Sequence, residues 1–230
     1  MIKETINKLH SELPSTVRLV AVSKFHPFEA IEEAYAAGQR IFAESRPQEL
    51  LAKVNRLEQI RDERGEPDYM SDIQWHFIGH LQTNKLKMVL PYVSLVQSVD
   101  SVRLLDAIQN WGATNNKVIP VLLEPHVAAE ESKQGFAPEE VFSVLDNVEA
   151  YPNISFRGIM GMATFTDDET VVRSDFARLR EIYDACRSRF NTSGEDFTEL
   201  SIGMSDDYPI AVEYGSTMVR IGSMIFGQRY

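Results

Sequence analysis

The residue best suited to covalent chemistry in this chain is Lys24, at the end of a short apolar segment. The segment covers 17–24, and Pro27 follows it closely. An apolar run of this length predicts a buried strand that the proline ends. Lys24 has the same side-chain parity as Val20 and Val22, so its amine is expected to share their face of the strand.

A lysine on a buried face can act as a nucleophile. Burial disfavours the ammonium form, so it lowers the pKa of the lysine and leaves a neutral amine. Such an amine suits a Schiff base with an aldehyde, and the aldehyde that proteins most often hold in this way is pyridoxal phosphate. The segment alone also allows a structural interpretation, in which Lys24 extends from the strand end and keeps its charge in water.

A second charged side chain, Arg220, lies within an apolar segment near the C-terminus. The surrounding residues 218–222 include no acidic residue. A buried guanidinium needs a partner, and because arginine stays protonated it could donate a hydrogen bond to a pyridine nitrogen. A salt bridge to a distant carboxylate, such as Glu199 or Glu213, is the alternative.

Small and hydroxyl residues follow the last two predicted strands. Gly203 allows close backbone approach, and Ser205 is a predicted N-cap for a helix over 206–214. Gly222 and Ser223 offer backbone amides and a hydroxyl on the neighbouring strand. Barrel enzymes commonly bind phosphate with these loops and a helix N-terminus. An ordinary helix start at Ser205 is the structural alternative.

The elements that must position these residues alternate between strand and helix along the chain. The predicted strands are 17–24, 40–44, 73–79, 93–98, 118–124, 156–163, 198–204 and 217–222. Helices are predicted between them, and an amphipathic helix opens the chain. This pattern predicts an α/β protein with a (β/α)8 TIM barrel and an extra N-terminal helix, and a doubly wound open sheet is the alternative. Since no linker or repeat divides the chain, 1–230 is expected to form a single domain.

A barrel of this kind gathers functional groups at the carboxyl ends of its strands. Lys24, Glu124, Ser205 and Arg220 all lie at or near such ends. His76 and His80 share a parity near the end of the third strand, which allows a metal site, although no cysteine or clear third ligand accompanies them.

Composition narrows the classes of partner. The net charge is −11, which disfavours binding to nucleic acid or anionic membranes. The single cysteine, Cys186, excludes an intrachain disulfide and fits a reducing compartment. The N-terminus lacks the apolar core of a signal peptide, and no apolar stretch approaches the ~20 residues of a membrane span. We therefore expect a cytoplasmic protein with no nucleic-acid or membrane partner, and we expect a monomer.

Five segments of the chain resemble signatures of one family, the YggS/PROSC pyridoxal-phosphate homeostasis proteins. They are 21–24, 75–85, 130–135, 200–207 and 215–227. The similarity extends over nearly the whole chain, and the last segment is highly specific. The resemblance implies a single-domain barrel of the alanine-racemase type that binds pyridoxal 5'-phosphate without established catalysis.

The resemblance also implies roles for individual residues. Lys24 becomes the Schiff-base lysine, Arg220 faces the pyridine nitrogen, and the phosphate is held by Ser205, Gly222 and Ser223. The chain departs from the family where an asparagine usually follows the second strand. Ser45 stands there, with a shorter side chain and no amide, and is the expected cofactor contact. Lys133 fits the family pattern Glu-x-x-Lys-x-Gly and could supply a second amine.

Two functions can use this set of residues. One is a non-catalytic carrier of the cofactor that serves cofactor-accepting enzymes, and the other is a pyridoxal-phosphate-dependent amino-acid racemase. Arg220 at the pyridine nitrogen would weaken the electron sink but still permit racemisation. Alanine racemases carry a second domain that supplies a tyrosine base, and only 224–230 follow the last predicted phosphate loop. We therefore expect the carrier and not an enzyme. A barrel that binds another phosphate ligand without a Schiff base is a third possibility.

Overall fold

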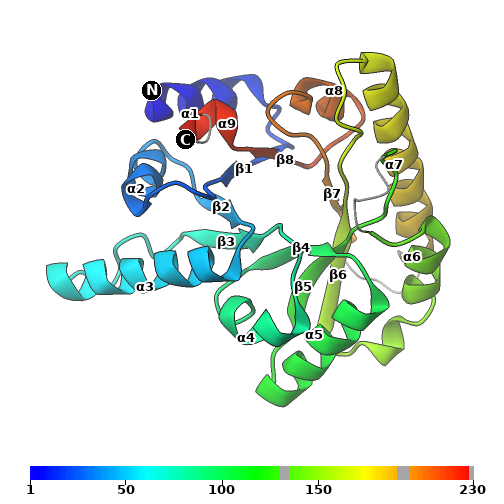
Figure 1. The fold of residues 1–230 in the computed structure, drawn as a ribbon, viewed down its shortest axis with the longest axis horizontal. Coiled ribbons are helices and arrows are strands. Elements are labelled where there is room, and N and C mark those ends of the chain that lie inside the picture. Colours follow the sequence, from blue (N-terminus) through cyan, green and yellow to red (C-terminus); the bar gives the residue numbers. More distant parts are fainter. Residues whose placement is uncertain (130–134, 191–196, 228–230) are drawn as a thin grey trace.

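The strands of the computed structural model, which describes residues 1–129, 135–190 and 197–227, close into a barrel (Figure 1). All the strand pairs are parallel and follow the chain order, and the first strand also pairs with the eighth. The strands are β1 Arg18–Val22, β2 Ile41–Glu44, β3 Gln74–Phe77, β4 Leu95–Val99, β5 Ile119–Leu123, β6 Ile154–Met160, β7 Glu199–Ser201 and β8 Met218–Ile221. This closure confirms the predicted (β/α)8 TIM barrel and rules out the open sheet.

Helices surround the barrel (Figure 1). They are α1 Ile2–Glu12, α2 Phe28–Ala36, α3 Pro47–Arg64, α4 Leu86–Val89, α5 Val102–Asn115, α6 Pro138–Leu145, α7 Glu169–Phe190, α8 Tyr208–Glu213 and α9 Ser223–Phe226, with 3-10 turns at Thr83–Lys85 and Val148–Ala150. The extra helix α1 packs against α2 and α9 and buries Ile6 and Leu9. None of the helices in the described ranges has the length and apolar character needed to cross a bilayer.

The structure differs from the predicted bounds mainly from β6 onward, where β6 spans Ile154–Met160 and not 156–163. Strand β7 ends at Ser201, three residues before the predicted end, because Gly203 turns the backbone with a φ of 96°. Helix α8 begins at Tyr208 instead of 206, and the short helix α9 was not predicted. A four-residue helix leaves too little periodicity for a sequence pattern to reveal it.

The barrel interior is partly polar. Its apolar part consists of Val20, Val22, Ala43, Leu95, Leu122, Met160 and Met218. Between these lie the buried side chains of His76, Gln97, Ser201 and Arg220. A buried polar group needs hydrogen-bond partners, so these four side chains constrain each other's orientation.

Candidate functional site

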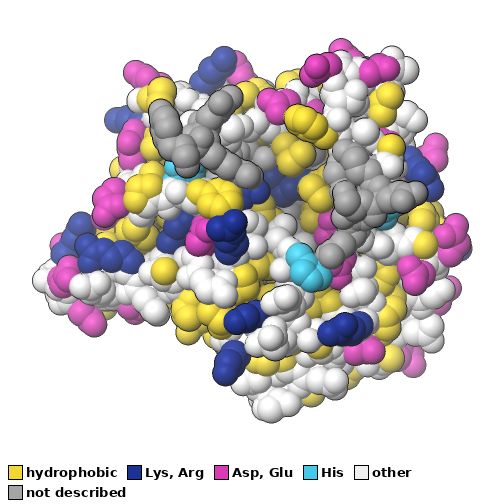
Figure 2. Space-filling view, viewed as in Figure 1, with side chains coloured by type: hydrophobic (Ala, Val, Ile, Leu, Met, Phe, Trp, Pro, Cys, Tyr) yellow, Lys and Arg dark blue, Asp and Glu magenta, His cyan; other side chains and the backbone are white. Residues whose placement is uncertain are grey.

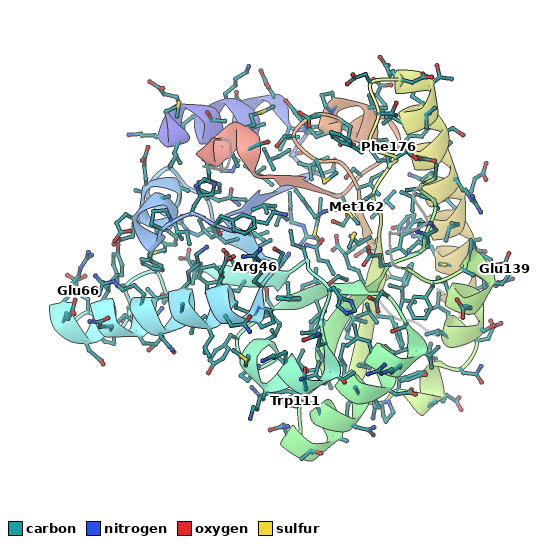
Figure 3. All side chains as sticks on the ribbon, in the orientation of Figure 1. Arg46, Glu66, Trp111, Glu139, Met162 and Phe176 are labelled. Atoms are coloured by element: carbon teal, nitrogen blue, oxygen red, sulfur yellow. The ribbon has the colours of Figure 1, made fainter. Side chains whose placement is uncertain are left out.

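A pocket of about 270 Å³ opens at the carboxyl ends of the strands, and it brings together most of the predicted site residues. Its lining includes Lys24, Ser205, Arg220, Gly222 and Ser223. Met162, labelled in Figure 3, also lines it from the segment after β6. Figure 2 shows Lys and Arg side chains near the centre of the face over the barrel, on a molecule with a net charge of −11.

The sequence positions Lys24 at this pocket through strand parity. Val20 and Val22 point into the barrel, as predicted, and Lys24 follows them where β1 leaves the sheet. Its side chain is half-buried. The next residue, Phe25, has a φ of 69°, so the chain turns sharply directly after the lysine.

A buried cluster of Ser23, Glu44 and Lys53 lies beneath this turn. The Lys53 ammonium donates to Glu44 Oε1 at 2.5 Å and to the Ser23 carbonyl at 2.7 Å. The Ser23 hydroxyl donates to the same Glu44 oxygen at 2.6 Å. Burial raises the pKa of Glu44, and the Lys53 charge opposes that rise. Glu44 Oε2 is buried without a hydrogen-bond partner among the described residues.

Sequence reasoning missed Lys53, although the helix pattern carried a signal. Leu50, Lys53, Val54 and Leu57 share the buried stripe of α3. A lysine on such a stripe needs an anionic partner inside the protein. The partner itself could not be read from the pattern, because Glu44 belongs to β2.

Among the described residues, Arg220 is held by hydrogen bonds and makes no salt bridge. Its Nη1 donates to the Ser201 carbonyl at 2.7 Å and to Ser201 Oγ at 2.8 Å, and Nη2 donates to the Gly161 carbonyl at 2.9 Å. The suggested partners are wrong, because Glu199 pairs with Arg18 and Glu213 pairs with Arg173. Burial lowers the pKa of Arg220 to about 10, and the charges of Glu124 and Asp207 counteract this effect.

A line of hydrogen bonds continues from Arg220 across the barrel. Ser201 Oγ donates to Gln97 Oε1 at 2.7 Å, and Gln97 Nε2 lies 2.8 Å from His76 Nδ1. The amide nitrogen can only donate, so His76 Nδ1 accepts and carries no proton. This agrees with burial, which lowers the pKa of His76 to about 3. This series of hydrogen bonds holds the Arg220 guanidinium next to Ser201 of β7.

The two histidines near β3 do not meet. His76 is buried inside the barrel, whereas His80 is exposed and its Nδ1 lies 3.0 Å from Asp100 Oδ2. They line different pockets. The suggestion that they share a metal site is therefore wrong, and the described ranges contain no group of three or more His, Cys, Asp or Glu residues suited to a metal.

The loops after β7 and β8 meet at the phosphate end of the predicted site. Ser205 Oγ accepts a hydrogen bond from the Met224 amide at 3.5 Å. The prediction of Ser205 as an N-cap is wrong, because Asp207 precedes α8 and its Oδ1 accepts from the Met204 amide at 2.5 Å. A Cβ at Gly222 would lie 3.1 Å from the Val22 carbonyl, so the backbone approaches closely there. Two hydroxyls beside small residues fit a phosphate group, and the Lys24 amine fits an aldehyde.

One predicted residue, Ser45, is not part of this set. Ser45 is half-buried where its backbone packs against Gly79, and it is not among the residues that line the pocket. Lys133 lies outside the described residues.

A further titratable group, Glu124, lies inside the barrel mouth at the end of β5. Its side chain is 7% exposed. Burial raises its pKa to about 7, the Arg220 charge opposes the rise, and Asp100 adds to it. The sequence placed Glu124 at a strand end, but its raised pKa depends on burial that only the folded barrel creates.

Comparison with known proteins gives consistent matches over the whole chain. The alanine racemase N-terminal domain family matches residues 1–230. A pyridoxal phosphate homeostasis protein of Aquifex aeolicus is 37% identical over 212 residues, covering 92% of this chain and 87% of the relative. The human protein of the same name is 37% identical over 239 residues, covering 99% of this chain and 82% of the relative.

Solved structures agree with these sequence matches. The structure of PipY from Synechococcus elongatus with PLP bound superposes with a TM-score of 0.86 at 32% identity, covering 99% of this chain and 100% of that protein. An alanine racemase of Clostridium difficile gives a TM-score of 0.74 at 13% identity, covering 99% of this chain and 56% of the racemase. The latter similarity concerns the fold alone.

Proposed function

Because the chain belongs to the pyridoxal phosphate homeostasis protein family, built on the barrel of the alanine racemase N-terminal domain, we propose that it binds pyridoxal 5'-phosphate in the pocket described above. The observation that carries the proposal is the convergence of Lys24, Arg220 and the two serine loops on one pocket. Each of these groups complements a different part of the cofactor.

Lys24 holds the cofactor through a Schiff base, and the other residues orient it. Ser205, Gly222 and Ser223 bind the phosphate through hydroxyls and backbone amides. Arg220 presents a guanidinium, fixed by Ser201 and Gly161, to the pyridine nitrogen. The bound cofactor supplies an aldehyde for the amine and a conjugated ring that can accept electrons. Ser45 is left out of this assignment because it is not in the pocket lining.

We place the protein among carriers of the cofactor and not among racemases. Racemisation uses two bases on opposite faces of the substrate carbon. The described lining contains Lys24, His26 and Asp206 as possible bases but no tyrosine. Burial lowers the pKa of His26, and the Lys53 charge lowers it further. A charged guanidinium at the ring nitrogen also disfavours ring protonation, which weakens the electron sink.

The chemical test is to trap the cofactor on the protein. Borohydride reduction of the loaded protein followed by peptide mapping should find the pyridoxyl label on Lys24, and Lys24→Ala should abolish it. Lys117→Ala, which removes an exposed lysine, is the matched control. A label confined to other lysines would contradict the assignment.

A second measurement separates carrier from enzyme. Incubation of the loaded protein with L-amino acids should yield no D-isomer or keto acid at ordinary enzyme rates, about 1 per second or faster. Turnover at that rate that disappears in Lys24→Ala would support the racemase instead.

The setting follows from the same proposal. We propose that the carrier delivers its cofactor to cofactor-accepting enzymes. We also propose that it is located in the cytoplasm and that it is a monomer. The buried free thiol of Cys186 is compatible with a reducing compartment. Light scattering of the loaded protein tests the monomer, and direct transfer of the cofactor to an apo-enzyme tests the partnership.

A further inference from the structure

Two side chains of helix α3 form hydrogen bonds with the main chain on either side of Lys24. We propose that Glu49 and Lys53, one helical turn apart, are positioning residues that fix the direction in which the lysine amine enters the pocket. This inference rests on the proposed function, because it concerns how Lys24 reaches the aldehyde of the cofactor. It adds to that function two residues that are not themselves among those that line the pocket.

The first of these two hydrogen bonds, to the main-chain carbonyl before Lys24, is buried. Lys53 Nζ donates to the carbonyl of Ser23, the residue before Lys24, at 2.7 Å. The same ammonium is paired with Glu44 at 2.5 Å, and Lys53 is 7% exposed. Because the pair is shielded from water, the ammonium cannot exchange the carbonyl for solvent without a large cost. The peptide plane that enters Lys24 therefore has a fixed orientation.

The second hydrogen bond, from the main-chain amide after Lys24, lies nearer the surface. The amide of Phe25, the residue after Lys24, donates to Glu49 Oε2 at 2.8 Å. The Arg46 guanidinium lies 4.5 Å from the centre of the Phe25 ring and 3.4 Å from Glu49 Oε1. Figure 3 shows Arg46 at the end of α3 that meets the barrel. The peptide plane that leaves Lys24 is therefore anchored to the same helix.

These contacts add to the hydrogen bond within the turn itself, in which the His26 amide donates to the Ser23 carbonyl at 3.1 Å. Phe25 has a φ of 69°, in the left-handed region that residues with a side chain rarely adopt. Such a conformation persists only where the surroundings hold it, and it is often found at functional sites. With both flanking peptide planes fixed, the Cα–Cβ bond of Lys24 has one direction. The helix thus sets the direction in which the Lys24 side chain leaves the main chain before any ligand arrives.

The step that depends on this orientation is formation of the Schiff base. The neutral Lys24 amine adds to the aldehyde carbon, a C=N bond replaces the C=O bond, and the oxygen leaves as water with the two amine hydrogens. No oxidant or reductant is required. A poorly aimed amine slows this addition but leaves non-covalent binding of the ring and phosphate intact.

That distinction provides the test. We would measure the rate of Schiff-base formation with pyridoxal 5'-phosphate by absorbance, and the affinity for pyridoxine 5'-phosphate, an alcohol that cannot form the bond. Glu49→Ala should slow Schiff-base formation about tenfold or more while the affinity for the alcohol stays within about twofold. The double variant Glu44→Gln/Lys53→Met, which removes both buried charges together, should behave in the same way. Glu49→Ala decides the proposal, because the Glu49 side chain is partly exposed and its removal leaves no buried charge without a partner.

Glu58→Ala is the matched control. Glu58 also lies on α3 and pairs with an arginine three residues away, Arg61, at 2.6 Å, but it has no described contact with the turn after β1. An unchanged rate in Glu49→Ala, or an equal loss of rate and alcohol affinity, would overturn the inference. If the wild-type protein itself forms no Schiff base, the proposed function fails instead, so the two failures are distinguishable.

Discussion

Replacing Glu124 with glutamine should stabilise the unliganded protein at alkaline pH and not at acid pH. The Glu124 carboxyl is buried at the end of β5, and burial raises its pKa from 4.5 to about 7. The folded protein therefore binds this proton more tightly than the unfolded chain does. Between pH 4.5 and 7 the folded state loses stability through this group as pH rises.

The size of the effect follows from the two pKa values. Each tenfold change in proton affinity corresponds to about 1.4 kcal/mol, so a rise from 4.5 to about 7 corresponds to roughly 3 kcal/mol of lost stability above pH 7. Glutamine has nearly the same shape and no charge to bury, so it avoids this loss. For a chain of this size 1 kcal/mol changes Tm by about 2–4 °C, which places the upper limit of the gain at roughly 6–12 °C.

Thermal unfolding of both proteins between pH 4 and pH 8 measures the effect. The difference in Tm should be small at pH 4, where the wild-type carboxyl is protonated, and should grow to a plateau above pH 7. Glu139→Gln, which neutralises a glutamate on the exposed surface, shows what the loss of one charge does outside the barrel. A Glu124→Gln protein that is less stable than wild type at pH 8 would refute the reasoning, since it would mean that attraction to Arg220 outweighs burial.

Three further variants test the site and the barrel. Ser205→Asp should weaken cofactor affinity at least about tenfold, measured by fluorescence titration, because it sets a negative charge against the phosphate, whereas Ser143→Asp on the exposed surface should not. Gln97→Met should lower the free energy of unfolding in urea by about 2–4 kcal/mol, because two buried groups lose their partner; a smaller loss would show that they find others. Gly158→Ala should cost more than about 4 kcal/mol or prevent folding, because its φ is 152° and a Cβ would overlap the Glu199 backbone; a normal urea midpoint would contradict this.

The sequence by itself determined the architecture and most of the pocket. Strand and helix periods revealed the alternation that a barrel requires, and side-chain parity placed Lys24 on the inner face with Val20 and Val22. The buried setting of Arg220 was also readable, because no polar residue adjoins it in the apolar run. Such properties are local: a period reports which face of an element is buried, and a strand end reports where a parallel barrel gathers its groups.

Only the tertiary structure decided which groups meet. Arg220 takes its acceptors from β7 and the segment after β6, not from the acidic residues suggested by the sequence. Lys53 reaches the carbonyl of Ser23, and Gln97 joins β4 to His76 and Ser201 across the barrel. These pairings depend on barrel closure and strand register, which bring distant segments within hydrogen-bonding distance. A sequence pattern shows that a buried polar group needs a partner, but the identity of that partner is set by the packing of the whole chain.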